Sequence, residues 1–395
     1  MTDKNSTTQK RGSDLESLLH SEHIITVEKM AVGGSAVARI AVADKSVVVF
    51  IPYGAPNDEL KIKISAVEKN FLNGEIIEII KAGSGRRTAA CEYFGRCGGC
   101  LWQHIDESEQ VLQKELILKD LFKKFLPAVE YNLLPTVSTP EKLGYRNRIQ
   151  LKQMGQKIGY FKHESHDIVE INNCLISETA LQNYIPTFKT KLRPSEKLKK
   201  FEIKINQTGG VEHYPVGEFG EGLAFSQVNR FVNQRLVETV TGLAQKLNPE
   251  QITELYAGAG NFTFPLAEAL PKTAIQAVEL SSQLTKSAVE RIKTEKKHKK
   301  ISFFTTKSEI YCRNSATFSE DFVLLDPPRS GCDSEVISVL SDKKPKAILY
   351  ISCHPVNLVR DLKNLTTKYK IGHLQIFDMF PQTDHFETVC LLERI

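Results

Sequence analysis

Hydrophobic and polar positions follow a strand-like pattern in the first part of the chain. Short β-branched runs at 24–27, 47–52 and 60–64 are separated by Gly, Pro and Asn. Several short strands at this spacing predict a small, OB-like β-barrel. The pair Gly33-Gly34 predicts a tight bend between two of these strands.

The pattern becomes mixed over residues 107–214. Apolar residues recur at helical spacing over 107–126, which predicts a helix. Strand-like runs follow at 149–152, 157–161 and 201–205. We therefore expect a mixed α+β central domain.

From residue 227 onward, helical segments alternate with short apolar strands. A helix is expected over 227–247. The strands are expected at 252–256, 274–278, 301–305, 322–325, 347–351, 374–378 and 388–392. This alternation predicts a doubly wound, Rossmann-like α/β sheet, whose ligands bind at the carboxyl ends of the strands. The expected organisation is a disordered tail (1–20), the barrel (21–83), the central domain (84–224) and the α/β domain (225–395).

Composition and charge narrow the class of protein. The chain has no apolar run long enough to span a membrane and no signal-peptide pattern at its N-terminus, so we expect a cytoplasmic protein. The net charge is +5, and residues 141–200 alone carry 12 Lys and Arg against 6 Asp and Glu, a local net of 12 − 6 = +6. Such a segment is either a solvated face or a footprint for a phosphate backbone, and charge alone does not separate the two.

A glycine loop predicts a nucleotide-like cofactor. Gly258 and Gly260 follow the first strand of the α/β domain and open a helix, where backbone approaches a nucleotide closely. Thr263 occupies the region in which a pyrophosphate-binding loop has its third glycine. Glu279 ends the second strand, where a carboxylate accepts hydrogen bonds from ribose hydroxyls. A ribose without a pyrophosphate indicates S-adenosylmethionine rather than NAD.

Two further strand ends carry candidate chemistry. Asp326 and Cys353 each follow a buried strand, so both are expected in the cofactor cleft, although most free cysteines are inert and buried. A thiolate that adds to carbon 6 of a uracil makes carbon 5 nucleophilic, and a base must then remove the carbon 5 proton. Asp384, His385 and Glu387 lie just before the last strand and are the candidate bases; spacing does not separate Glu387 from His385.

Three of the eight cysteines, Cys91, Cys97 and Cys100, lie within ten positions of one another. In a cytosolic chain such clustering indicates a metal site rather than disulfides. Thiolates at this spacing suit an iron–sulfur cluster or a zinc ion.

Together these features resemble the bacterial RNA uracil-C5 methyltransferase family over nearly the whole chain. The segments that carry the resemblance are Phe225-Ser226-Gln227-Val228-Asn229, the glycine loop, Asp326-Pro327-Pro328-Arg329, Ser352-Cys353-His354-Pro355 and His385-Phe386-Glu387. Residues 24–80 resemble the family's RNA-binding TRAM domain. The cysteine cluster, with Cys174 downstream, resembles the [4Fe-4S] site of its 23S ribosomal RNA members.

The resemblance implies a class I methyltransferase domain that methylates carbon 5 of a uridine in 23S ribosomal RNA; the alternative is the same reaction on a transfer RNA uridine. Cys353 would be the nucleophile and Glu387 the base. S-adenosylmethionine would be bound by Gln227, Tyr256, Asn261, Glu279 and Asp326, and the cluster by Cys91, Cys97, Cys100 and Cys174. Phe225 would lie near the target base, and Arg146 and Arg148 would contact RNA phosphates.

Two positions depart from the family pattern. His354 follows the nucleophile where many members have Asn, and no residue around 305–308 clearly matches the usual adenine contact. A non-catalytic RNA-binding or iron–sulfur sensing protein is the alternative outside this class, but such a protein needs neither Cys353 nor Glu387. We expect a monomer that binds RNA and no membrane.

Overall fold

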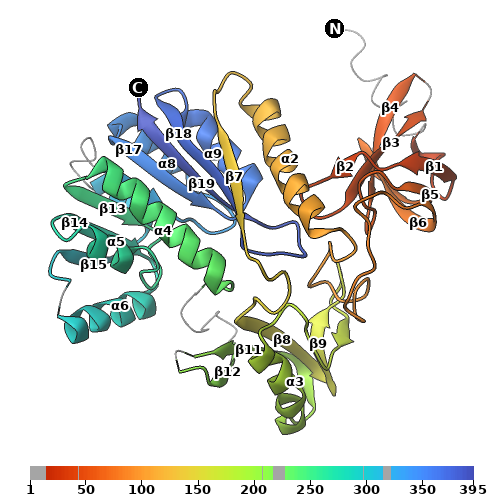
Figure 1. Cartoon of the computed structure of the whole chain (residues 1–395), viewed down its shortest axis with the longest axis horizontal. Coiled ribbons are helices and arrows are strands. Elements are labelled where there is room, and N and C mark those ends of the chain that lie inside the picture. The colour runs from red at the N-terminus through yellow and green to blue at the C-terminus, as the bar shows by residue number, and fades with distance from the viewer. Residues whose placement is uncertain (1–14, 43, 207, 217–226, 297, 315–321) are drawn as a thin grey trace, which may run out of the picture.

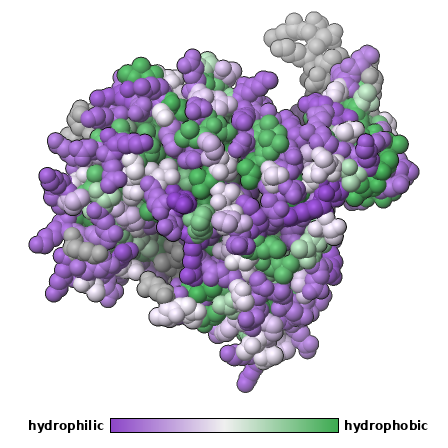
Figure 2. All heavy atoms as spheres, viewed as in Figure 1, coloured by the Kyte–Doolittle hydropathy of each residue, from purple (hydrophilic) through white to green (hydrophobic). Residues whose placement is uncertain are grey.

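The computed structural model describes residues 15–42, 44–206, 208–216, 227–296, 298–314 and 322–395. It contains sheets of six, five and eight strands. Each sheet forms the centre of one part of the molecule, and helix α2 (Glu107–Phe125) lies between the first sheet and the third (Figure 1). Among the described residues, no helix is long and apolar enough to cross a membrane. Polar side chains cover most of the face seen in Figure 2.

The N-terminal sheet curls into a barrel with strand order β1-β5-β6-β4-β3-β2. The strands are β1 (Glu22–Thr26), β2 (Lys29–Met30), β3 (Ala36–Val42), β4 (Lys45–Ile51), β5 (Glu59–Val67) and β6 (Phe71–Lys81). Leu60, Ile62 and Ile64 of β5 are fully buried, as the two-residue period of a strand requires. Gly33 and Gly34 adopt φ values of 94° and 87° at the predicted bend between β2 and β3.

The barrel begins earlier than the sequence indicated. The disordered tail was expected to reach residue 20, but the backbone N–H of His20 donates to the Ile64 carbonyl at 2.9 Å. Leu18 packs against the barrel core. Residues 15–20 are therefore part of the barrel domain. The sequence does not predict this, because the segment is short and has little periodicity, and its contacts with the barrel are tertiary.

The central sheet is antiparallel, with strand order β10-β9-β8-β11-β12. Its elements are β8 (Arg148–Gly155), β9 (Lys157–Phe161), β10 (Ile168–Glu170), β11 (Ser195–Ile205), β12 (Val211–Pro215) and α3 (Thr179–Lys191). Ile185 and Phe188 of α3 pack on Leu151 and Ile203 of the sheet. Cys91, Cys97 and Cys174 lie at the edge of this small core.

The third sheet has the order β15-β14-β13-β16-β17-β19-β18-β7. Its strands are β7 (Leu133–Ser138), β13 (Gln251–Leu255), β14 (Ala274–Glu279), β15 (Ile301–Thr305), β16 (Phe322–Leu325), β17 (Ala347–Ser352), β18 (Tyr369–Asp378) and β19 (Glu387–Arg394). β13 to β17 are parallel, whereas β19 is antiparallel to both its neighbours. This arrangement confirms the predicted Rossmann-like methyltransferase fold.

Helices cover both faces of this sheet. One face carries α4 (Arg230–Leu247), α5 (Thr263–Ala269) and α6 (Ser282–Glu295), and the other carries α2, α7 (Ser308–Asn314), α8 (Ser334–Lys343) and α9 (Pro355–Leu365). The core on the face that carries α2, α7, α8 and α9 continues through α2 into the barrel, so the barrel and the α/β domain share one apolar interior.

The predicted central domain (84–224) is wrong over residues 107–138. β7 pairs in parallel with β18 as the edge strand of the third sheet, and α2 packs in the core shared with α9. β7 was not predicted because its six residues are short and include Pro135, which strands tolerate only at an edge.

A buried ion pair joins α2 to this sheet. Lys114 Nζ lies 2.6 Å from Asp378 Oδ1, and the two side chains are 0% and 2% exposed. Nζ also donates to the Phe380 carbonyl at 3.2 Å, and Ser138 Oγ donates to Asp378 Oδ2 at 3.1 Å. The pair therefore ties α2, β7 and β18 together, and removal of either charge leaves the other buried and uncompensated.

Lys114→Ala is expected to lower the free energy of unfolding by about 3–5 kcal/mol, because it leaves the buried Asp378 carboxylate without its charged partner. The matched control is Lys119→Ala on the same helix: Lys119 is 45% exposed and lies 3.7 Å from Glu115. That change should stay within about 0.5 kcal/mol. Urea unfolding followed by circular dichroism measures both, and equal effects would contradict the assigned role of the pair.

Candidate active site

The candidate residues meet where parallel strands end. Asp326 follows β16 directly and Cys353 follows β17. The two strands are neighbours, with Leu325 in register with Tyr350. The side chains of Asp326 and Cys353 therefore leave the sheet at the same edge, as the sequence predicts.

Glu387 reaches this edge from the antiparallel strand. Ser352 at the end of β17 pairs with Thr388 near the start of β19. The next step along this ladder sets Cys353 opposite Glu387. Because β19 runs against β17, its first residue lies beside the last residues of β17, which brings the thiol and the carboxyl group together.

The three candidate bases face different surroundings. Asp384 Oδ2 accepts a hydrogen bond from the Gly33 backbone at 2.9 Å, toward the barrel. The His385 ring, whose side chain is 41% exposed, contacts Arg329, with Nη2 3.0 Å from Nε2. Glu387 is 3% exposed, and its Oε2 has no hydrogen-bond partner among the described residues. An unpaired buried acceptor costs about 1–3 kcal/mol, so it calls for a functional explanation.

The carboxyl groups of the cleft hold protons unusually well. Burial raises the pKa of Asp326 to about 7. Burial, and then the charge of Asp326, raise the pKa of Glu387 to about 8 against the opposing effect of Arg329. Burial also raises the pKa of Glu254 to about 8, although Thr263 donates a hydrogen bond to it at 2.5 Å. The cleft is therefore a desolvated site in which each negative charge raises the pKa of its neighbours.

The same surroundings act on the thiol. Burial, followed by the charges of Glu387 and Asp326, raises the pKa of Cys353 to about 12, and Arg329 opposes this. The thiolate is the nucleophilic form. A positive charge added to the cleft, or loss of a carboxylate charge, would therefore favour the reactive form.

The glycine loop fits a ribose-bearing ligand. The Gly258 N–H donates to Glu279 Oε2 at 2.9 Å, and the Ser281 N–H donates to Oε1 at 2.7 Å. Gly258 has φ 59°, and a Cβ built on it would meet nothing within 4 Å, so open space lies beside the Glu279 carboxylate. At Gly260 a Cβ would lie 2.5 Å from the Phe264 ring, so the turn requires glycine.

Other predicted cofactor residues have their side chains engaged elsewhere. The Tyr256 hydroxyl accepts from the Asp333 N–H at 3.5 Å and lines a cavity of about 550 Å³ near α8. The Asn261 amide pairs reciprocally with Asn233 of α4, at 3.1 and 3.2 Å. Gln227 is buried just before α4. Phe225 lies outside the described residues.

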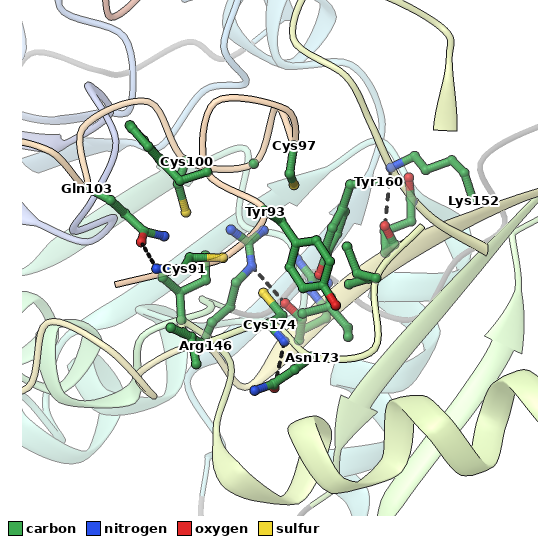
Figure 3. Close-up of a pocket in the computed structure, with 18 of the residues that line it drawn as sticks. Cys91, Tyr93, Cys97, Cys100, Gln103, Arg146, Lys152, Tyr160, Asn173 and Cys174 are labelled. Carbon is green, nitrogen blue, oxygen red and sulfur yellow. Dashed lines mark hydrogen bonds between the residues drawn. The ribbon is translucent and has the colours of Figure 1, made fainter. Parts of the chain in front are cut away.

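The four predicted cysteine ligands line one cavity of about 390 Å³ in the central domain (Figure 3). In the described part of the chain, no three of these sulfurs lie within 4.8 Å of one another. A zinc ion with Zn–S bonds of about 2.3 Å holds its four sulfurs roughly 3.8 Å apart. Four thiols on one cavity suit an iron–sulfur cluster or a zinc ion. Burial raises the pKa of Cys97 to about 11 and of Cys100 to about 12, so metal binding must displace protons.

The arginines predicted to contact RNA lie beside these cysteines. Arg146 and Arg148 are half-buried and line the same cavity. Arg146 Nε donates to the Arg148 carbonyl at 2.9 Å, and Arg148 Nη1 lies 3.6 Å from Glu202. The exposed basic residues of the segment lie elsewhere and include Lys197, Lys199 and Lys200 of β11, which sequence reasoning did not single out.

Glu387→Gln is expected to speed alkylation of Cys353 by iodoacetamide several-fold at pH 9. At that pH the native Glu387, with a pKa of about 8, is ionised, and its charge holds the Cys353 pKa up. The amide carries no charge, so the thiol pKa falls and the thiolate fraction rises. Mass spectrometry of the Cys353 peptide measures the rate. Glu393→Gln, at the far end of β19, is the control and should change nothing; slower alkylation in Glu387→Gln would refute the electrostatic account.

Comparison with known proteins places this arrangement in a family. Residues 218–395 match the model of the tRNA (Uracil-5-)-methyltransferase family. An uncharacterised RNA methyltransferase of Bdellovibrio bacteriovorus is 40% identical, over 95% of this chain and 96% of its own. A 23S rRNA (uracil(1939)-C(5))-methyltransferase of Acinetobacter baumannii is 26% identical, over 95% and 96%.

A solved structure has the same fold. It is the tRNA (uracil-54, C5)-methyltransferase of Pyrococcus abyssi in complex with S-adenosyl-L-homocysteine, with a TM-score of 0.67 at 20% identity over 94% of this chain and 100% of that one. The Bdellovibrio relative matches from end to end, and the family model covers the domain that contains Asp326, Cys353 and Glu387. The chain belongs to the family of S-adenosylmethionine-dependent RNA uracil-5-methyltransferases.

Proposed function

We propose that the chain methylates carbon 5 of a uridine in 23S ribosomal RNA through a covalent bond between Cys353 and carbon 6 of the base. The observation that carries the proposal is the register of β17 and β19: its last pair is Ser352 with Thr388, so Cys353 and Glu387 are the next residues along the two chains, at the sheet edge where Asp326 follows β16. A protein that only binds RNA needs neither a thiol nor an unpaired carboxyl group at this edge.

Addition of the thiol to the base would make carbon 5 of uracil nucleophilic enough to be methylated. Carbon 5 of uracil is too weak a nucleophile to take a methyl group directly. When the Cys353 thiolate adds to carbon 6, the electrons of the carbon 5–carbon 6 double bond move to the carbonyl oxygen, and carbon 5 of this enolate becomes nucleophilic. S-adenosylmethionine supplies the electrophilic methyl group. Loss of the carbon 5 proton then expels the thiolate by β-elimination and restores the double bond.

Glu387 has the properties of the base that removes this proton. Its charge acts on the pKa of Cys353 at the adjoining strand end, and its Oε2 has no partner among the described residues. Its pKa of about 8 lies close to neutral pH, where a general base works best. Asp384 and His385 are engaged with Gly33 and Arg329, which supports Glu387 over both.

The glycine loop supports the cofactor assignment. Glu279 is held by two backbone N–H groups and keeps free lone pairs for ribose hydroxyls beside the open space over Gly258. Asp326 lies at the neighbouring strand end. Tyr256 and Asn261 belong to the same loop segment, and we assign them, together with Gln227, to this site by the family resemblance.

We assign the cysteine cavity to a [4Fe-4S] cluster bound by Cys91, Cys97, Cys100 and Cys174. The support is the convergence of four thiols on one cavity, together with the family resemblance of the cysteine spacing. The barrel, which resembles a TRAM domain, and the Acinetobacter relative favour ribosomal RNA as the substrate. The Pyrococcus structure is of a transfer RNA enzyme, so transfer RNA is the alternative.

Cys353→Ala is expected to abolish methyl transfer, and Glu387→Gln to accumulate a covalent enzyme–RNA adduct, because proton removal is blocked after methylation. The assay uses total RNA from a strain that lacks the gene, with labelled cofactor, and denaturing gels reveal the adduct. Cys312→Ala and Glu393→Gln are the matched controls, since Cys312 lies in α7 and Glu393 at the other end of β19. A fully active Cys353→Ala enzyme would end the proposal.

The same assay identifies which RNA is the substrate. Label is expected in 23S ribosomal RNA, at a uridine identified by mapping 5-methyluridine in the treated RNA. Label confined to transfer RNA would establish the alternative.

Protein purified without oxygen is expected to contain about four irons and four sulfides per chain, which is the composition of the cluster. Cys97→Ser should lose most of the iron and the associated visible absorption, because a ligand is removed. Cys332→Ser, a buried cysteine outside the cavity, is the control. Stoichiometric zinc without iron would refute the cluster assignment.

A further inference from the structure

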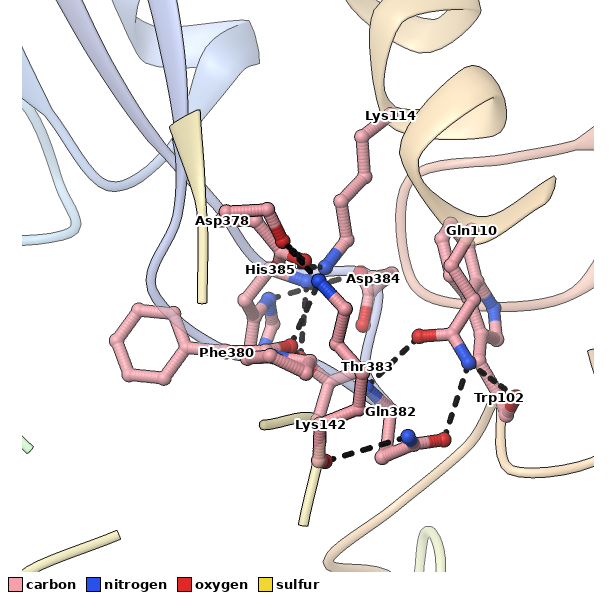
Figure 4. A network of polar contacts seen from close by, with 12 residues as sticks. Trp102, Gln110, Lys114, Lys142, Asp378, Phe380, Gln382, Thr383, Asp384 and His385 are labelled. Carbon is pink, nitrogen blue, oxygen red and sulfur yellow. Dashed lines mark hydrogen bonds and ion pairs between the residues drawn. The ribbon is translucent and has the colours of Figure 1, made fainter. Parts of the chain in front are cut away.

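The loop that leads to Glu387 has one residue at its centre whose hydrogen bonds reach several separate segments of the chain. This loop, residues 379–386, is here called the base loop; it connects β18 to β19. Gln382 in its middle is fully buried and adopts φ 70°. Figure 4 shows Gln382 facing Gln110 and Lys142, with Trp102 nearby.

Every polar group of Gln382 is used. Its backbone carbonyl accepts from the N–H groups of Leu101 at 3.2 Å and Trp102 at 3.0 Å, and its N–H donates to Gln110 Oε1 at 2.8 Å. Its side-chain Oε1 accepts from Arg87 Nη2 and Gln110 Nε2, both at 3.0 Å. Nε2 donates to the Lys142 carbonyl at 3.3 Å.

The contacts of Gln382 lead directly to the cysteine cavity. Leu101 and Trp102 follow Cys100 in the chain. Arg87 Nε also donates to the Gln103 carbonyl at 3.0 Å, and Gln103 Oε1 accepts from the Cys91 N–H at 3.2 Å. Cys100 is thus one residue away from a contact with the base loop, and Cys91 is linked to it through Gln103 and Arg87.

The barrel holds the same junction from the other side. Trp102 Nε1 donates to the Gly34 carbonyl at 2.9 Å, next to the Gly33 N–H that binds Asp384 of the base loop. A Cβ on Gly34 would lie 2.5 Å from Leu101, so barrel turn and cysteine segment are in close contact. Leu101 and Trp102 therefore lie between the barrel and the base loop and contact both.

We propose that Gln382 is a positioning residue that couples the metal centre bound by the four cysteines to the placement of Glu387. Cys100 would be held in place as a ligand of the centre, Leu101 and Trp102 would then hold the base loop through the Gln382 carbonyl, and the loop would hold Glu387 beside Cys353. This inference rests on the proposed function. Misplacement of a reacting group by about 1 Å costs up to about 100-fold in rate, so loss of this coupling slows the chemical step rather than RNA binding.

The first test replaces Gln382 with Asn, which keeps an amide and accepts a positive φ but is too short to reach Arg87 and Gln110. The single-turnover rate of methyl transfer is expected to fall by about 10- to 100-fold, with the KM for RNA and the iron content unchanged. Gln375→Asn in β18 is the matched control, because Gln375 Nε2 makes one exposed hydrogen bond, to the Pro135 carbonyl at 2.9 Å. An unchanged rate, or a loss confined to KM, overturns the proposal.

Arg87→Lys gives a second route if Gln382→Asn does not fold. Its side chain is 31% exposed, so the substitution is tolerated more easily, and the shorter donor should produce a rate loss of the same kind. A full rate in this variant would count against the coupling.

The coupling itself is tested by combining Gln382→Asn with Cys100→Ser. If the metal centre acts through Gln382, the double variant is no slower than the slower single variant, whereas independent effects multiply and overturn the proposal. Cys353→Ala is included in the same assay. Activity in that variant refutes the proposed function itself, whereas an inactive Cys353→Ala beside a fully active Gln382→Asn refutes only the role of Gln382.

Discussion

The structure depends on the buried ion pair between Lys114 and Asp378. Asp378 is the last residue of β18, and the base loop begins at the next residue. The pair holds the start of this loop against α2, and Lys114 also binds the Phe380 carbonyl within the loop. A charge pair in an apolar interior is stable only when both partners are present and hydrogen-bonded. The start of the loop is therefore held on both sides of residue 379, at Asp378 and Phe380, by contacts with Lys114 that are lost if α2 moves away.

The chemistry depends on a reversal of strand direction. In a wholly parallel sheet the start of a strand and the end of its neighbour lie at opposite edges. Because β19 runs against β17, Glu387 at its start meets Cys353 at the end of β17. Asp326 joins them from β16, since parallel strands end at a common edge. The insertion of one antiparallel strand thus builds the site from three separate segments.

The electrostatics of this edge suit a positively charged cofactor. Three carboxyl groups with raised pKa values and a thiol with a pKa of about 12 occupy a desolvated cleft. Such a site is poorly ionised by itself, because each charge lacks water and disfavours the next. A sulfonium or ammonium group in the cleft would favour ionisation of both carboxyl group and thiol. Under the proposed function, the positive charge of the cofactor would thereby favour the thiolate form of Cys353.

The sequence by itself determined the element types of the α/β domain, since alternating apolar runs and helical periodicity are local properties. It also identified Cys353, Asp326 and Glu279 as strand-end residues and grouped three of the cysteines. It did not assign β7 to the third sheet, nor place Arg146 beside the cysteines, because pairing and packing join segments far apart in the chain. Gln382 carried no sequence signal, since its importance lies in hydrogen bonds to partners up to 295 positions away. Local pattern decided which residues begin and end each element, and only tertiary contact decided which of those ends meet.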